Sequence, residues 1–391
     1  FGDGSEFPVN FDLDSYQLDG TDGFLFLGTN TNINKSRSVY NTGDIDGDGF
    51  SDMAFTHYNE IVEGQGRGDG SAADRDGGLS ILYGGTNIGA GGLVTEDQVG
   101  VSVRGVNFTS NDDDLAAAYM AGDVNGDGID DILINGVRSG EGSISAPTYL
   151  VYGVAGGLSG TINLTTDYAQ YGVKFDNSAS LPYQGFRFEQ SSTGDINGDG
   201  LDDIVFSGDY GDAIWVVYGQ QGGFDTSSIF VNEYATGSQG FQFDMPSGST
   251  RNSASILDFN GDGYADLSVA SDAADLDGFT NNGFATVIYG GDFTGKVSQE
   301  GTSGDDMLIG TELGDNLLGG QGDDHLCGKG GADALNGGLG NDTLVVSDAD
   351  FIRLDGGAGF DTALWAGVNI DLDLASAPSG LIKDIEHIDL T

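Results

Sequence analysis

The stretch Asp44-Ile45-Asp46-Gly47-Asp48-Gly49-Phe50-Ser51-Asp52 determines how this chain folds, because the sequence contains the same pattern four times. Side chains bearing oxygen stand at positions 1, 3, 5 and 9, and Gly stands at position 6. Hard cations such as Ca²⁺ take ligands of this kind, with a backbone carbonyl at position 7, and Gly permits the sharp turn. The pattern therefore predicts a calcium loop at every copy.

All four loops offer the same kinds of ligand. The predicted ligands are Asp44, Asp46, Asp48, Phe50 and Asp52; Asp123, Asn125, Asp127, Ile129 and Asp131; Asp195, Asn197, Asp199, Leu201 and Asp203; and Asp258, Asn260, Asp262, Tyr264 and Asp266, with position 7 acting through its carbonyl. An EF-hand loop ends on a bidentate Glu at position 12, but position 12 is apolar in every copy here. Each loop instead leads directly into a short apolar segment with strand character.

The loops recur about every 60 to 80 residues, a spacing that suits blades of about four strands. Two further landmarks accompany them. We expect each unit to open with a pair of aromatic residues after Gly, as in 185–188 and 240–243, and to end with an apolar strand that finishes in Tyr-Gly, as in 79–84. A calcium loop that leads into a strand resembles the FG-GAP repeat of integrin α-subunit β-propellers and their bacterial relatives. The resemblance implies an all-β fold in which residues 1–295 form an FG-GAP-type β-propeller.

The number of blades stays open at this point. The integrin relatives imply seven blades, whereas four calcium-bearing units are recognisable here. The opening Phe1-Gly2 matches the end of a unit, so we expect that Phe1 is not the natural start of the array. The alternatives are a smaller closed propeller of four or five blades, blades missing from the given chain, or strands supplied by a neighbouring copy.

After Gly301 the repeat shortens to nine residues, with Asp at the sixth place and Leu at the eighth. This pattern resembles the nonapeptide G-G-x-G-x-D-x-U-x of RTX proteins, which implies a parallel β-roll with capping strands over 296–391. The predicted calcium ligands are Asp306, Asp315, Asp324, Asp333, Asp342 and, in a final unit, Asp361. Leu313 and Lys329 stand where Gly is expected, which predicts weaker sites beside them.

Further strands are expected near the end of the chain. A strand-like insert at 345–354 interrupts the repeats before the final unit. The segments 368–374 and 381–390 are apolar at alternate or regular positions, which predicts strands that cap the roll.

The acidic composition makes bound calcium a condition of folding. The chain has 62 acidic against 13 basic residues and a formal charge of -49, while 38% hydrophobic residues argue against disorder. Such charge opposes compaction unless cations neutralise it, and about eight Ca²⁺ ions would leave roughly -33. The same charge disfavours nucleic acid and anionic membranes as partners.

Several features indicate an extracellular setting. The single cysteine, Cys327, excludes an internal disulfide framework, and calcium sites of modest affinity fill where free calcium is millimolar. No run of 18 apolar residues and no N-terminal signal are present, so membrane insertion is not expected. The RTX resemblance implies type I secretion of the full-length parent.

No catalytic constellation is recognisable. The three histidines are far apart in sequence, and neither Gly-x-Ser-x-Gly nor His-Glu-x-x-His occurs, so the prediction is that the chain is not an enzyme. We expect a structural or adhesive protein, a surface adhesin, matrix or fibre subunit, with copies of itself or cell-surface glycans as partners. The alternative is a secreted module that binds or degrades polysaccharide. Arg67-Gly68-Asp69 matches a tripeptide that integrins recognise, and chance is the favoured explanation in a chain so rich in Gly and Asp.

Overall fold

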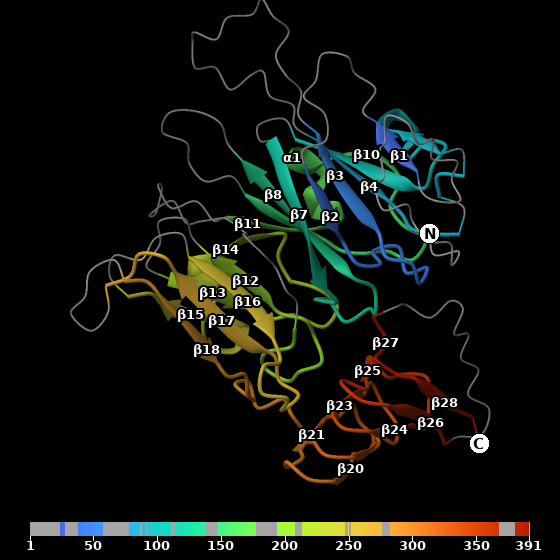
Figure 1. Cartoon of the computed structure of the whole chain (residues 1–391), viewed down its shortest axis with the longest axis vertical. Helices are drawn as coiled ribbons and strands as arrows, with labels where there is room; N and C mark the ends of the chain where they lie inside the picture. The colour runs from blue at the N-terminus through green and yellow to red at the C-terminus, as the bar shows by residue number, and fades with distance from the viewer. Residues whose placement is uncertain are drawn as a thin grey trace, which may run out of the picture.

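The computed structural model describes residues 24–27, 38–57, 78–86, 88–90, 92–110, 114–137, 147–176, 194–207, 213–246, 249, 252–275, 282–366 and 380–390 (Figure 1). These residues are almost all in strands and turns. The α-helices among them are the single turns α1 (Leu164–Asp167) and α2 (Val231–Tyr234). The all-β class predicted from the sequence is confirmed.

The first two calcium loops each connect two strands of a five-stranded sheet. The strand orders are β10-β6-β4-β3-β2 and β14-β11-β9-β8-β7. The strands of the first sheet are β2 (Val39–Asn41), β3 (Met53–His57), β4 (Gly78–Leu82), β6 (Gly105–Thr109) and β10 (Gly160–Asn163); those of the second are β7 (Asp114–Gly122), β8 (Asp131–Val137), β9 (Thr148–Val151), β11 (Gly172–Asp176) and β14 (Ser228–Phe230). Four antiparallel strands form each sheet, and a strand from later in the chain joins its edge in parallel.

The third and fourth loops lead into smaller sheets. One has the order β12-β13-β15 and the other β16-β17-β18. Their strands are β12 (Ile204–Ser207), β13 (Ala213–Val217), β15 (Gly240–Asp244), β16 (Ser253–Leu257), β17 (Asp266–Ser271) and β18 (Phe284–Ile288), and a parallel pair is formed by β1 (Leu25–Leu27) and β5 (Leu93–Thr95). In all four units the strand after the loop pairs antiparallel with the strand that precedes Tyr-Gly.

The aromatic strands occupy a different place from the one that the sequence suggested. We expected the Gly-aromatic segment to open each unit, but β6, β11 and β15 instead follow the Tyr-Gly strand as the next strand of the same sheet. In the third unit Val216 pairs with Phe241, so the aromatic pair extends the sheet already begun. The segment 185–188 lies outside the described residues.

The apolar faces of successive sheets pack against each other. Leu79 of the first sheet and Ile132 of the second belong to one buried cluster, and Phe175 and Phe206 join the second sheet to the third with ring centroids 4.9 Å apart. A third cluster joins the sheets of the third and fourth loops. Among the described strands no sheet closes on itself, so the propeller stays a prediction.

The last hundred residues form two parallel five-stranded sheets. Their orders are β19-β21-β23-β25-β27 and β20-β22-β24-β26-β28, so consecutive strands alternate between the sheets. The strands are β19 (Gln299–Glu300), β20 (Met307–Ile309), β21 (Asn316–Gln321), β22 (His325–Cys327), β23 (Ala334–Leu339), β24 (Thr343–Val346), β25 (Arg353–Asp355), β26 (Thr362–Trp365), β27 (Ile382–Lys383) and β28 (His387–Asp389). Each repeat therefore pairs with the second repeat after it, as Leu317 does with Leu335.

The repeated leucines form the core between these two sheets. Leu317, Leu326, Leu335 and Leu344 are almost fully buried in one cluster. The insert at 345–354 supplies β25, whose Leu354 pairs with Leu335 and so takes the place of a repeat. The predicted strand region at 381–390 gives β27 and β28, one in each sheet, whereas 368–374 lies outside the described residues.

A membrane-spanning helix is not found in the part of the chain that the structure describes, where no helix has the necessary length and hydropathy.

Candidate calcium sites

The carboxylate at position 1 holds each loop in its curved shape. In the second loop, Asp123 accepts hydrogen bonds from the backbone N–H groups of Gly126, Asp127 and Gly128 at 2.7, 3.0 and 2.7 Å. Gly128 has φ of +83°, a conformation that a side chain would strain. Equivalent bonds to Asp44, Asp195 and Asp258 occur in the other loops. The loop is thus held in shape by hydrogen bonds between its first carboxylate and its own backbone.

The carboxylate at position 9 attaches the loop to the neighbouring Tyr-Gly strand. Asp131 is buried, and its two oxygens accept the N–H groups of Val124, at position 2, and Gly153, which ends the Tyr-Gly strand, at 3.0 and 2.9 Å. The same pair of bonds is made by Asp52, Asp203 and Asp266. The recurring Tyr-Gly landmark thus has a structural reason, because its Gly donates to the residue that closes the loop.

Position 7 also follows a common pattern. The backbone N–H groups of Phe50, Ile129, Leu201 and Tyr264 donate to the position 5 carboxylates at 3.1, 3.0, 3.2 and 3.0 Å. Coordination through the carbonyls of these four residues stays a prediction.

The first loop brings its acidic ligands together. Asp44, Asp46 and Asp48 each offer an oxygen, and these oxygens lie within 4.8 Å of one another. Oδ1 of Asp46 is buried without a hydrogen-bond partner among the described residues, as is Oδ1 of Asn197 in the third loop. Burial, and secondarily the charge of Asp48, raise the pKa of Asp46 to about 6. A bound divalent cation removes this conflict between burial and charge, so the donor set fits Ca²⁺.

Basic side chains contact two of the loops, which the sequence did not indicate. The Arg104 guanidinium contacts both Asp46 and Asp48, and Lys296 Nζ lies 2.6 Å from Oδ2 of Asp199. These cations stand beside the position 5 oxygen, where a calcium ion would supply positive charge. Both side chains are about half exposed, so an incoming ion can displace them into solvent.

In the second and fourth loops, the amide at position 3 makes the corresponding contact. Asn125 Nδ2 donates to Asp127 at 3.0 Å, and Asn260 Nδ2 donates to Asp262 at 2.7 Å. Rotating either amide would present its oxygen to an ion in place of its nitrogen.

The aspartates of the C-terminal repeats are stacked in columns. Oδ1 of Asp324 accepts the backbone N–H of Asp306, Oδ1 of Asp342 accepts that of Asp324, and Oδ1 of Asp361 accepts that of Asp342, each at 2.7 Å. A second column joins Asp315 to Asp333 at 3.0 Å. The structure therefore places all six predicted aspartates at equivalent points along the two sheets.

The second oxygens of three aspartates in one column have no hydrogen-bond partner among the described residues. Oδ2 of Asp324, Asp342 and Asp361 is buried without a hydrogen bond from any described residue. At the beginning of each column, Oδ2 of Asp306 and Asp315 is instead bound by Thr302 and Thr311. Burial raises the pKa of Asp333 and Asp342 to about 6. Buried carboxylate oxygens left open in this way suit a cation.

The two departures from the repeat are accommodated without breaking the sheets. Lys329 adopts φ of +75°, the left-handed conformation that the repeat usually assigns to Gly, and Leu313 is 74% exposed. Weaker calcium binding beside them stays a prediction. Arg67-Gly68-Asp69 lies outside the described residues.

Two kinds of acidic turn repeated along an all-β chain define the class of this molecule, a calcium-binding repeat protein. Comparison with protein-family models agrees. The FG-GAP repeat matches residues 250–288, which contain the fourth loop, and the RTX calcium-binding nonapeptide repeat (4 copies) matches residues 300–333 and 309–344. No curated protein matches the chain.

The chain therefore carries an FG-GAP repeat followed by RTX calcium-binding nonapeptide repeats, in the predicted order, and its cofactor is Ca²⁺. Repeats of these kinds fit a secreted calcium-binding protein and are typically not catalytic.

Proposed function

We propose that this chain is a calcium-stabilised extracellular protein with a structural or adhesive role. An FG-GAP-type propeller region, residues 1–295, is followed by an RTX β-roll with capping strands, residues 296–391. The observation that carries the proposal is the row of buried carboxylate oxygens at Asp324, Asp342 and Asp361, which no described residue hydrogen-bonds. Calcium bound there, and at the loop ligands named above, joins adjacent turns and stabilises the folded chain by mass action.

The ions in this proposal hold the fold together and perform no chemistry. Every position 1 and position 9 carboxylate in the loops already fixes backbone N–H groups, so an ion bound beside it becomes part of the same network. Millimolar calcium outside the cell fills sites of modest affinity, and the formal charge of -49 gives the ions a further role in reducing repulsion. Type I secretion of the full-length parent is part of this proposal.

Head-to-tail association of copies is the assembly that we propose for a fibre or matrix subunit. Such a heterologous contact repeats without closing and builds a filament. Light scattering and electron microscopy in millimolar calcium test it, with filaments expected in calcium and loss of filaments after EGTA. Monomers alone under these conditions would contradict the assembly while leaving the calcium-dependent fold intact.

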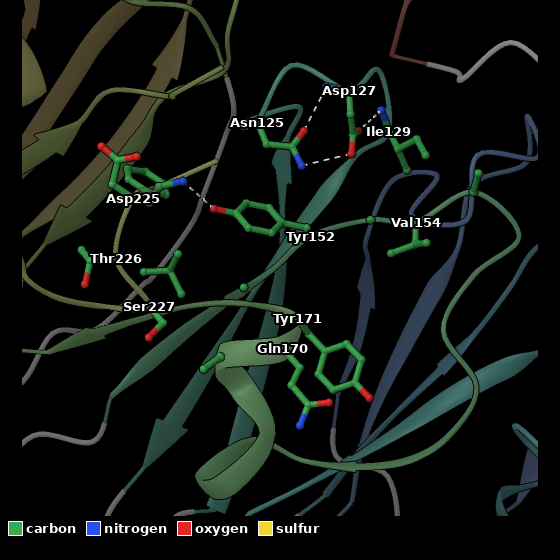
Figure 2. Close-up of a pocket in the computed structure, with 16 residues that line it drawn as sticks. Asn125, Asp127, Ile129, Tyr152, Val154, Gln170, Tyr171, Asp225, Thr226 and Ser227 are labelled. Carbon is green, nitrogen blue, oxygen red and sulfur yellow. Dashed lines mark hydrogen bonds between the residues drawn. The ribbon is translucent and has the colours of Figure 1, made fainter. Parts of the chain in front are cut away.

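A cavity in the second unit supports polysaccharide binding as the second candidate function. It has a volume of about 880 Å³ and lies beside the second calcium loop (Figure 2). Its lining combines the aromatic rings of Tyr152 and Tyr171 with the polar side chains of Gln170 and Thr226. Aromatic faces beside hydroxyl and amide groups suit a sugar, while Asp225 in the lining disfavours acidic glycans.

A glycan array probed in millimolar calcium tests this second function. Binding to neutral glycans should be lost in Tyr171→Ala and kept in Tyr289→Ala, a matched change at a tyrosine that is 57% exposed and does not line the cavity. Binding that persists in Tyr171→Ala would locate the glycan site elsewhere, and turnover of the bound polysaccharide would identify an enzyme.

A further inference from the structure

Position 8 of the calcium loop connects one loop to the next. This position is Asp130 in the second loop and Asp202 in the third, and neither is a predicted ligand. Oδ2 of Asp130 accepts the backbone N–H of Asp44, position 1 of the first loop, at 2.9 Å. Oδ2 of Asp202 accepts the N–H of Asp123, position 1 of the second loop, also at 2.9 Å. Each carboxylate therefore fixes the first ligand of the preceding loop.

A glycine directly precedes the first loop and another precedes the second loop, and each leaves space for the carboxylate that reaches over from the following loop. Gly43 and Gly122 have φ of +76° and +65°, and a Cβ at either position would collide with the carboxylate of Asp130 or Asp202. The fourth loop differs at both points, since its position 8 is Ala265 and the residue before it is Leu257. The carboxylate link thus runs from the third loop to the second and from the second to the first.

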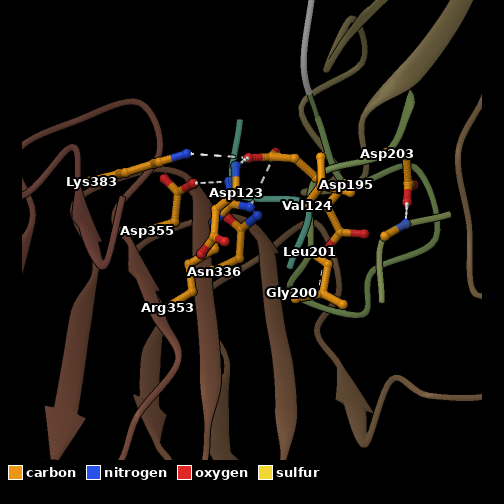
Figure 3. A network of polar contacts seen from close by, with 12 residues as sticks. Asp123, Val124, Asp195, Gly200, Leu201, Asp203, Asn336, Arg353, Asp355 and Lys383 are labelled. Atoms are coloured by element: carbon orange, nitrogen blue, oxygen red, sulfur yellow. Dashed lines mark hydrogen bonds and ion pairs between the residues drawn. The ribbon is translucent and has the colours of Figure 1, made fainter. Parts of the chain in front are cut away.

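Asp202 makes a further set of contacts with the C-terminal repeats. Its side chain is 2% exposed, and its oxygens lie 3.4 Å from Arg353 Nη1 and 3.5 Å from Lys383 Nζ. Arg353, on β25, also pairs with Asp355 at 2.8 Å. Figure 3 shows Arg353, Asp355 and Lys383 on the C-terminal repeats, facing the second and third loops. A buried carboxylate requires such partners to remain charged.

Other loop residues lie at the same boundary. Asn336 Nδ2 donates to the carbonyl of Gly263 at 3.0 Å, and Gln321 Nε2 donates to that of Asn260 at 3.2 Å. The N–H of Gly380 donates to the carbonyl of Gly128 at 2.8 Å. The second, third and fourth loops therefore all contact the C-terminal repeats. Asp202, of the third loop, joins this contact to the second loop.

We propose that Asp202 is a positioning residue that couples the calcium loops to the C-terminal repeats. Its hydrogen bond orients Asp123 for calcium in the second loop, and its charge holds Arg353 and Lys383 at the boundary. Asp130 performs the first task for the first loop. Partners that orient a metal ligand from behind are typically worth about 10- to 100-fold in metal affinity.

A calcium titration of the full chain, followed by amide hydrogen exchange on separate peptides, resolves the individual loops. Asp202→Ala should raise the calcium concentration needed to protect 123–131 by about 10- to 100-fold and leave 258–266 unchanged. The matched variant Asp130→Ala should shift 44–52 in place of 123–131. If Asp202 had only a structural role, Asp202→Ala would lower the protection at saturating calcium. The two variants would then not differ in which loop needs more calcium.

Asp202→Asn separates the two tasks. Its amide oxygen can still accept the N–H of Asp123, so the calcium midpoint of 123–131 should shift less than in Asp202→Ala. Its lost charge should increase exchange in 353–355, which Asp130→Ala should not do, because the guanidinium of Arg353 pairs with Asp202. If Asp202→Ala does not fold, Asp202→Asn alone tests whether Asp202 couples the second loop to the C-terminal repeats.

The inference is overturned if Asp202→Ala affects only its own loop, 195–203, or if Asp130→Ala and Asp202→Ala shift the same peptides. It rests on the proposed calcium loops, and the two can fail separately. Wild-type protein without a calcium response at 44–52 and 123–131 would refute the loops themselves. A wild-type response with unshifted variants would refute only the role of position 8.

Discussion

The four acidic loops between residues 44 and 266 and the C-terminal repeats use aspartate in different ways. In a loop, Asp123 accepts N–H groups from residues three to five positions later in the same turn. In the repeats, Asp324 accepts the N–H of Asp306 from a different turn. A loop is therefore shaped locally, whereas a repeat is completed by its neighbours. Calcium-free folding should consequently differ between the two regions.

Removal of calcium should have the largest effect, and mainly on the repeats. Their core is one buried cluster, and their stacked carboxylates repel one another without the ion. The sheets of the first three loops, in contrast, share buried clusters on successive faces. EGTA should therefore unfold 300–390 first, seen as loss of strand signal by circular dichroism and of exchange protection at 334–346. Unaltered strand content, or earlier loss of protection at 132–134, would contradict the comparison.

Breaking a column of aspartates in its middle should have the next largest effect. Asp342→Ala removes the acceptor of the Asp324 N–H and one buried oxygen. Leaving that N–H unpaired lowers the free energy of unfolding by about 1 to 3 kcal/mol, and the lost calcium binding lowers it further. Urea unfolding in millimolar calcium, followed at the C-terminal repeats, measures this loss of unfolding free energy. Asp306→Ala, at the exposed beginning of the same column, is the matched control and should be milder. Equal effects would show that the column does not act as a stack.

Acidification should affect the calcium-free and calcium-bound proteins in opposite directions. Burial raises the pKa of Asp46, Asp333 and Asp342 from 3.8 to about 6 in the ion-free fold. Their contribution to stability is then fully present below pH 3.8 and is lost as the pH rises through 6. The melting temperature in EGTA should thus rise between pH 7.5 and 5, whereas the increment due to calcium should shrink, because protons compete for the same oxygens. Parallel pH profiles with and without calcium would contradict this.

The smallest effect is expected at the first loop, where Arg104 competes with the ion. Removing the charge in Arg104→Gln should increase the calcium affinity of this loop by up to about fivefold, the equivalent of an exposed ion pair of about 1 kcal/mol. Exchange protection of 44–52 against calcium concentration measures it, and Arg104→Lys should retain most of the competition. Weaker binding in Arg104→Gln would indicate that the guanidinium supports the site.

The acidic loops and the columns of repeated aspartates were predictable because their residues stand at short, fixed spacing. That these residues coordinate calcium stays a prediction. The sequence pattern also identified the strand after each loop and the buried leucines of the repeats. It misplaced the aromatic strands, since a strand between two loops can pair with either sheet and only the register of β13 with β15 assigns it. It also missed Arg104, which is 58 residues from Asp46.

The sequence alone determined the all-β class, the order of the two repeat types and Ca²⁺ as the cofactor, because each depends on side chains that lie within a few positions of one another. Only the tertiary structure showed which loop supplies the carboxylate that hydrogen-bonds the first residue of another loop. Asp202 is 79 residues from Asp123 and 151 residues from Arg353, and nothing in its local sequence distinguishes it from any other Asp in a turn. Contacts between repeats depend on how the sheets stack, and this stacking is set by the packing of all the buried side chains together.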